Sequence, residues 1–371
     1  MRPRIARVAL AACLLGPSAA SAQAQGTTPF DRYDVNKDGK VIRTEVPERL
    51  RERFDSIDLD KDGTITAEEQ RAYLLDGPGS PPRAKVEQDI PYAGTKDPRQ
   101  TLDLLLPAKP RTPGPLPVVV SLHGGAWLGG NKAQGIASIR PLVLSGDYAA
   151  VAINYRLTGQ ASWPAQAHDV KAALRWVRDN AAKYHLDPDR IGVIGQSAGG
   201  HLAALLGTSG GVADLEGDPG PGVKVRCVVD EYGPADLLVM GDPPGFSNHN
   251  DADSPESKLV GGPIQERKDV ARAASPITYV SKDDPPFLII HGDKDRTVAF
   301  DQSDRLAKAL RGAGVEALLV QVKGGGHGGF RNPEVASRIR QFFDKHLRDQ
   351  PVGTISEEPI PNVAPAGPKK E

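Results

Sequence analysis

The segment from Arg190 to Leu206 constrains the possible folds of this chain more than any other. A β-branched run ends in Gly195-Gln-Ser197-Ala-Gly199 and passes at once into an apolar, helix-like stretch. In such a strand–turn–helix the turn is so tight that the residues flanking the serine must lack bulk. The serine then stands at a helix N-terminus, where free N–H groups favour developing negative charge. The sequence therefore predicts that Ser197 is a nucleophile lifted out of a sheet.

Two later segments supply the partners that a catalytic serine requires, a base and an acid that orients it. The run 287–292 reads as a buried strand and ends in a loop that carries Asp293 and Asp295. The run 316–322 reads as another strand and leads to His327, which lies among five glycines. The order Ser, Asp, His is that of the α/β-hydrolase fold. We therefore expect an α/β fold, a mostly parallel twisted sheet flanked by helices.

An upstream loop predicts a site for the oxyanion of an acyl-transfer reaction. The run 116–122 reads as a buried strand, and His123-Gly124-Gly125 follows it directly. Loops of this type form the oxyanion hole in lipases and esterases. We expect the amides of Gly124, Gly125 and Ala198 to hold the tetrahedral oxyanion.

Several motifs taken together resemble a known family over roughly residues 86–348. They are His123-Gly-Gly-Ala-Trp, Asn154-Tyr-Arg-Leu, Gly195-Gln-Ser-Ala-Gly-Gly-His and Ala274-Ser-Pro-Ile-Thr. The chain resembles the bacterial esterase/lipase branch of the α/β hydrolases near hormone-sensitive lipase, and most closely the group of bifunctional feruloyl and acetyl-xylan esterases. Gln196 stands where the hormone-sensitive-lipase pattern has Asp, which favours the xylan-esterase side.

The resemblance implies hydrolysis of carboxylic esters, either simple short-chain esters or esters of plant polysaccharides, with no cofactor for catalysis. Its His-Gly-x-x-Asp pattern places the acid at Asp295, with Asp293 as the alternative. A prolyl-oligopeptidase-type peptidase shares the same triad order. A calcium-dependent docking or adhesion protein with an inert hydrolase fold is an alternative of a different class.

An internal repeat of 24 residues precedes the hydrolase region. Phe30-Asp-Arg-Tyr-Asp34 and Phe54-Asp-Ser-Ile-Asp58 each open a segment that matches the EF-hand calcium loop. The expected ligands are Asp34, Asn36, Asp38, Lys40 and Glu45 in the first loop, and Asp58, Asp60, Asp62, Thr64 and Glu69 in the second. The second loop gathers four carboxylates, so we expect it to bind Ca²⁺ more tightly. The compact repeat resembles dockerins, which makes a scaffold protein a possible partner, and the calcium is expected to be structural.

The N-terminus has the pattern of a signal peptide. Three arginines precede an apolar run at 8–15, and Ala20-Ser-Ala22 forms a cleavage site. The run is too short for stable membrane insertion. We expect a secreted or periplasmic protein, with a lipoprotein anchored through Cys13 as the second reading.

The resulting organisation has five parts. They are a signal peptide at 1–22, a small α-helical EF-hand pair at 27–75, a linker at 76–85, the α/β-hydrolase domain at 86–348 and a disordered tail at 349–371. The formal net charge of −1 gives no basic excess, so nucleic acid is not an expected partner. The polar segment 241–262 is either a cap over the substrate pocket or a plain surface loop.

Overall fold

The computed structural model describes residues 33–38, 40–51, 54–58, 62–66, 69, 84–217 and 222–363. The chain divides into two compact units, Met1–Pro82 and Arg83–Glu371. The expected signal peptide, Cys13 and Asp60 lie outside the described residues, as does most of the expected linker. The first strand of the larger unit begins at Ala84, inside the range expected for the linker.

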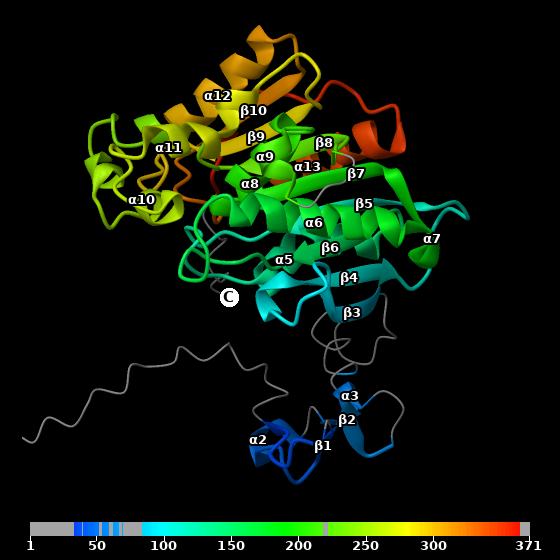
Figure 1. The fold of residues 1–371 in the computed structure, drawn as a ribbon. Helices are drawn as coiled ribbons and strands as arrows, with labels where there is room; N and C mark the ends of the chain where they lie inside the picture. The colour runs from blue at the N-terminus through cyan, green and yellow to red at the C-terminus, as the bar shows by residue number, and fades with distance from the viewer. Residues whose placement is uncertain are drawn as a thin grey trace, which may run out of the picture. The chain divides into compact units, whose positions relative to one another are not determined.

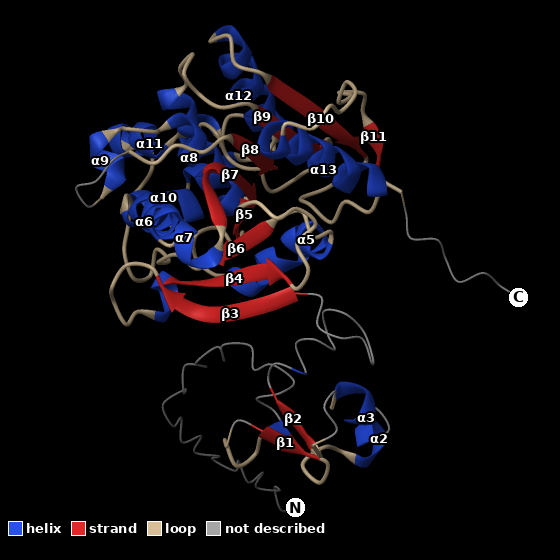
Figure 2. Ribbon diagram, turned by 90° about the vertical axis from the view of Figure 1, so that its right-hand side faces the viewer, coloured by secondary structure: helices blue, strands red, loops and turns tan. Residues whose placement is uncertain are grey.

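A nine-stranded sheet forms the centre of the larger unit, in the order β11-β10-β9-β8-β7-β5-β6-β4-β3 (Figures 1 and 2). Its strands are β3 Ala84–Pro91, β4 Thr101–Pro107, β5 Leu116–Leu122, β6 Ala149–Ile153, β7 Leu186–Gln196, β8 Cys227–Glu231, β9 Phe287–Gly292, β10 Ala317–Lys323 and β11 Ile360–Pro361. In this order, every pair of neighbouring strands from β11 to β6 is parallel. At the other edge of the sheet, β4 pairs antiparallel with both β6 and β3. The inner strands β5 and β8 are buried along their whole length, as expected for a sheet covered on both faces.

Helices cover both faces of this sheet. The α-helices described in the larger unit are α5 Lys132–Leu144, α6 Ala165–Asp179, α7 Ala181–Tyr184, α8 Ala198–Thr208, α9 Ala213–Glu216, α10 Pro255–Val260, α11 Lys268–Ala274, α12 Phe300–Gly312 and α13 Pro333–Arg348. The apolar sides of α6, α8 and α12 belong to one core cluster, and those of α5 and α13 belong to a second cluster on the opposite face. The expected α/β-hydrolase fold class is therefore confirmed.

The strand order reverses beside β5. The chain runs from β5 to β6 through α5 and then returns through α6 to β7, on the other side of β5. Ligands in open α/β sheets bind outside the carboxyl ends of the strands at such a switch point. Ser197 follows the last residue of β7 and so lies at this point.

The smaller unit contains the two expected calcium loops. Strands β1 (Lys40–Ile42) and β2 (Thr64–Thr66) pair antiparallel with Val41 opposite Ile65, which places the eighth position of one loop against the eighth position of the other. Helices α2 (Glu48–Arg51) and α3 (Phe54–Ile57) lie between the loops. Val41, Val46, Phe54 and Ile65 form a small core.

The expectation of a disordered tail from residue 349 is wrong for residues 350–363. Strand β11 pairs with β10, and Ile355 and Ile360 are buried. The buried Arg338 donates to the carbonyls of Ser356 and Glu358, at 2.8 and 2.7 Å. The proline-rich, charged composition suggested disorder, but two apolar side chains and a buried guanidinium bind the segment to α13.

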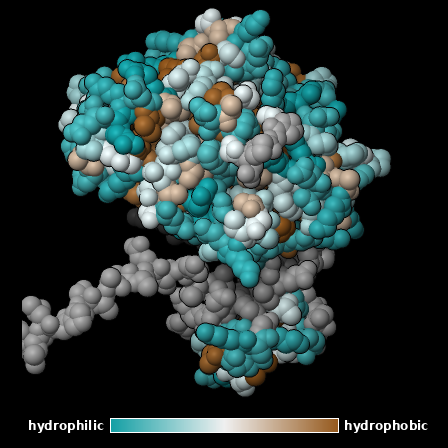
Figure 3. Space-filling model, in the orientation of Figure 1, coloured by the Kyte–Doolittle hydropathy of each residue, from teal (hydrophilic) through white to brown (hydrophobic). Residues whose placement is uncertain are grey.

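Hydrophilic residues cover most of the larger unit in the view of Figure 3, and hydrophobic residues lie scattered among them. Within the described part of the chain, no helix is long and apolar enough to cross a membrane.

Candidate active site

The backbone at Ser197 is held in a strained turn between β7 and α8. Its φ is 55° and its ψ is −121°, a conformation that typically costs about 1–3 kcal/mol outside glycine. The Ser197 amide donates to the Glu231 carbonyl at 2.9 Å, and the Ser197 carbonyl accepts from the His201 amide at 3.0 Å. A Cβ on Gly195 would collide with the Gly199 carbonyl, which explains why this turn needs small residues on both sides of the serine.

The structure brings Ser197, His327 and Asp295 together, as the sequence predicts. The Nε2 atom of His327 lies 2.9 Å from the Ser197 Oγ, and its Nδ1 atom lies 2.7 Å from the Asp295 Oδ2. With Nδ1–H donating to the carboxylate, Nε2 is left as the acceptor for the serine proton. Asp293 instead accepts from the Gly324 amide at 2.6 Å, so the geometry favours Asp295 as the acid.

Four donors surround the Asp295 carboxylate. One oxygen accepts from the amides of Thr297 and Val298 at 2.7 and 3.0 Å. The other faces both His327 and the Nε2 of the buried His291, which lies 3.2 Å away. Burial alone would raise the pKa of Asp295, but hydrogen bonds from His291, His327 and the two amides lower it well below its usual range. The carboxylate is therefore kept ionised next to His327.

The residues expected to form the oxyanion hole lie next to Ser197 in the structure. A Cβ on Gly124 would lie 3.4 Å from the Ser197 Cβ and 2.9 Å from the Gln196 carbonyl oxygen, so the loop passes close to Ser197. Gly125 has a φ of 117°, and Ala198 is the first residue of α8. Among the described residues, the amides of Gly124 and Gly125 donate no backbone hydrogen bond, so both are available to a ligand.

Two neutral histidines brace this loop. The indole N–H of Trp127 donates to the Nδ1 of His201 at 3.3 Å, and the other ring nitrogen of His201 donates to the Ala274 carbonyl at 2.6 Å. The Nδ1 of His123 lies 2.7 Å from the Gly124 carbonyl. Burial lowers the pKa of each imidazole to about 4, so both act as fixed hydrogen-bonding groups.

The segment 241–262 is a packed element and is anchored on the acid loop. It contains α10 and a 3₁₀ turn at Ser247–Asn250. The buried His249 lies with one ring nitrogen 2.9 Å from the Thr297 carbonyl and the other 3.0 Å from a Glu256 oxygen. Burial would lower the pKa of His249, but the hydrogen bonds and charge of these partners raise it. These contacts fix the segment to the loop that carries Asp295.

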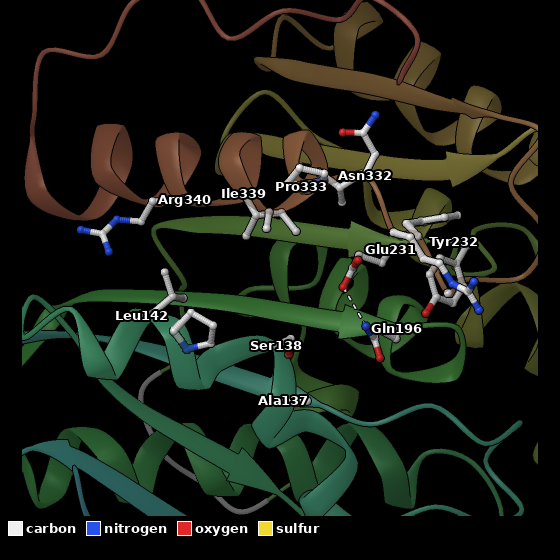
Figure 4. A pocket seen from close by; sticks show the side chains of 16 residues that line it. Ala137, Ser138, Leu142, Gln196, Glu231, Tyr232, Asn332, Pro333, Ile339 and Arg340 are labelled. Carbon is white, nitrogen blue, oxygen red and sulfur yellow. Dashed lines mark hydrogen bonds between the residues drawn. The ribbon is translucent and has the colours of Figure 1, made fainter. Parts of the chain in front are cut away.

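Sequence reasoning missed two buried acidic residues at the carboxyl end of β8. Asp230 accepts from the Gly233 amide at 2.9 Å, and Glu231 accepts from the side-chain amide of Gln196 at 3.1 Å (Figure 4). Burial raises the pKa of both carboxyl groups to about 7. Their place directly after an apolar strand was the available signal, because the strand ends of a parallel sheet line its binding crevice.

The two expected calcium loops differ in how far their side chains are arranged for a cation. No group of three or more His, Cys, Asp or Glu side chains in the described part of the chain is clustered to hold a metal. However, Asp58 is buried, and its Oδ1 has no hydrogen-bond partner among the residues that the structure describes. Glu45 and Glu69 each fold back onto an amide of their own loop, at 2.9 and 2.8 Å. A buried carboxylate oxygen without a hydrogen-bond donor, at the first position of a calcium loop, fits Ca²⁺.

Comparisons with known proteins match both units. The BD-FAE family model matches residues 102–310, and an EF-hand model matches residues 50–72. The chain is 33% identical to the esterase LipC of Mycobacterium tuberculosis, over 68% of this chain and 64% of that protein. The chain spans 55–64% of the length of three of the curated relatives it matches.

Solved structures show the same similarity. A truncated carbohydrate esterase from gut microbiota has a TM-score of 0.65 at 38% identity, covering 71% of this chain and 96% of that one. An acetyl ester-xyloside bifunctional hydrolase from Caldicellulosiruptor lactoaceticus has a TM-score of 0.57 at 25% identity, covering 70% and 96%. The resemblance to esterases that the sequence motifs indicate is therefore confirmed.

We predict that Asp230 makes the protein less stable as the pH rises from about 4 to about 7. The folded state holds the proton up to pH about 7, whereas the unfolded chain releases it near the ordinary value of 3.8, so ionisation opposes folding in this window. Asp230→Asn removes the group and should lessen the decline in unfolding free energy by up to roughly 1.4 kcal/mol per pH unit. Urea unfolding at pH 5, 6 and 7 measures this, and parallel curves for the two proteins would contradict it.

Proposed function

The chain belongs to the BD-FAE family, and from this membership we propose that it is a serine esterase that hydrolyses carboxylic esters. The observation that carries the proposal is the continuous hydrogen-bonded chain from the Ser197 Oγ through His327 to Asp295. Each side chain comes from a different loop at the carboxyl edge of the sheet, and each has the partner that its role requires.

In the proposed reaction the Ser197 Oγ attacks the ester carbonyl while the Nε2 of His327 takes the serine proton. The tetrahedral oxyanion rests on the amides of Gly124, Gly125 and Ala198, where loss of one donor typically costs about 3–4 kcal/mol. His327 then gives its proton to the departing alcohol, which leaves an acyl-enzyme. A water molecule attacks the acyl-enzyme by the same route in reverse.

We propose that the substrates are carbohydrate esters, namely acetyl or feruloyl esters of plant polysaccharides. The similarity to a carbohydrate esterase and to an acetyl ester-xyloside hydrolase supports this. The His123-Gly-Gly loop argues for ester over amide substrates and so against a peptidase. The assembled triad argues against an inert docking or adhesion protein.

The N-terminal unit is proposed to bind structural Ca²⁺ in a secreted or periplasmic protein and to offer a surface to a scaffold partner. The paired loops and the orphaned Asp58 oxygen support calcium binding. The bound ion would supply positive charge that relieves the repulsion among the loop carboxylates. It has no part in the proposed ester hydrolysis.

The central test is Ser197→Ala, assayed with p-nitrophenyl acetate. The variant should lose hydrolysis by a factor of about 10⁶ and should not be labelled by a fluorophosphonate probe, because no nucleophile remains. An unchanged thermal melting curve serves as the folding control. Residual activity near the wild-type rate would overturn the proposed mechanism.

A matched pair of variants separates the two acidic residues that follow β9. Asp295→Asn should lower kcat by about 10⁴, because the amide disrupts the tautomer and the charge on which His327 depends. Asp293→Asn should leave kcat within about twofold, since among the described residues the Asp293 carboxylate accepts a hydrogen bond only from the Gly324 amide. Steady-state kinetics on one ester checks both, and equal effects would contradict the assignment.

Calcium removal should affect the N-terminal unit alone. We expect excess EDTA to lower the melting temperature of that unit and added Ca²⁺ to restore it, because a ligand bound only to the folded state stabilises it. Glu69→Gln, which removes a loop carboxylate, should weaken the restoration. Calorimetry and direct calcium titration measure these effects, and melting that is independent of calcium would refute them.

A further inference from the structure

A cavity opens beside Ser197, on the face of the sheet that α5 and α13 cover. Its volume is 510 Å³, within the size range of small-molecule sites. Residues of α5 line one side and residues of α13 the other, while Gln196 and Glu231 lie between them at the ends of β7 and β8 (Figure 4). Neither Ser197 nor His327 lines it, so it is separate from the triad.

The cavity floor carries a polar pair with hydrogen-bonding capacity to spare. Among the described residues, the side chains of Gln196 and Glu231 hydrogen-bond only to each other, through the Gln196 Nε2 and the Glu231 Oε2. Glu231 is only 5% exposed. The second Glu231 oxygen, the Gln196 carbonyl and the second Gln196 N–H remain available to a ligand.

The remaining walls are mostly apolar. Leu142, Phe330, Pro333 and Ile339 line the cavity around the polar pair. Of the two arginines at the cavity, Arg340 is already paired with Asp147 and Asp344. An anionic ligand would therefore lie against the carboxyl group of Glu231, with one exposed arginine nearby. A cationic ligand would find a single acidic group in the cavity. A ring with hydroxyl groups on its edge and C–H groups on its faces satisfies both kinds of wall.

We propose that this cavity is a subsite for a neutral sugar ring of the polysaccharide that carries the ester, an inference that rests on the proposed function. Hydroxyl groups of the ring donate to Glu231 and accept from Gln196, and its apolar face packs against the aromatic and aliphatic wall.

The subsite lies close enough to the triad to hold a sugar next to the esterified one. Gln196 directly precedes Ser197, and the Glu231 carbonyl accepts a hydrogen bond from the Ser197 amide. The ring of Tyr232, which lines the cavity, lies with its centroid 4.8 Å from that of His327. One tyrosine ring thus separates the sugar from the catalytic imidazole.

The first experiment measures binding of unmodified xylotetraose to the full-length chain carrying Ser197→Ala, by isothermal titration. Saturable binding is expected. Ala336→Trp on α13, which fills the cavity, should weaken this binding at least about tenfold, or 1.4 kcal/mol. Ala137→Trp fills the cavity from the α5 side and should have the same effect. It takes the place of the first variant if that variant does not fold. Ala182→Trp, on α7 before the amino end of β7, is the matched control and should bind normally.

The second experiment compares kcat/KM for an acetylated xylo-oligosaccharide with kcat/KM for p-nitrophenyl acetate, in the chain that retains Ser197. The ratio should fall about tenfold in either cavity-filling variant and stay constant in Ala182→Trp. Absence of xylotetraose binding, or an unchanged ratio in both variants, would overturn the subsite while leaving the esterase proposal intact. Failure to hydrolyse any ester would instead refute the esterase proposal, and the subsite as a part of it.

Discussion

The strained backbone at Ser197 is the constraint on which the rest of the larger unit depends. A serine with positive φ relaxes unless its surroundings hold it. Here the Ser197 amide donates to the Glu231 carbonyl at the end of β8. The Ser197 carbonyl accepts from the His201 amide in α8, the helix that begins at the next residue. The glycines at 195 and 199 let the two elements approach closely. The sheet order matters because it places β8 next to β7, where a carbonyl can meet that amide.

Asp295 connects the catalytic geometry to parts of the chain that are distant in sequence. The Asp295 carboxylate accepts hydrogen bonds from its own loop and from His291. The carbonyl of Thr297 in the same loop accepts a hydrogen bond from His249 in the segment 241–262. A shift of that segment would therefore move the acid loop and, through it, His327. Segment 241–262 and the three side chains are thus connected by hydrogen bonds, which help to hold the imidazole in its orientation.

The sequence predicts those features whose signal is local. A tight turn around Ser197, a strand ending in Asp293 and Asp295, and a histidine among glycines each need only a few neighbouring residues to be recognised. The burial of Glu231 and the contacts of His249 depend on segments that are far apart in the sequence, which no local pattern encodes. The prediction of a disordered tail is wrong for the same reason, since Ile355 and Ile360 pack against residues of the sheet and α13 that are distant in the sequence.

Position 196 shows how one substitution can set the chemistry of a neighbouring cavity. With an aspartate there, two carboxyl groups would face each other next to the nucleophile and would have to share a proton, because like charges at such a distance cannot both be ionised. Gln196 instead donates to Glu231 and removes that repulsion without adding charge. The floor of the cavity then has at most one charge, and it presents donors and acceptors side by side. That combination suits hydroxyl groups better than ions, so the residue that departs from the lipase pattern is also the one that makes the cavity fit a sugar.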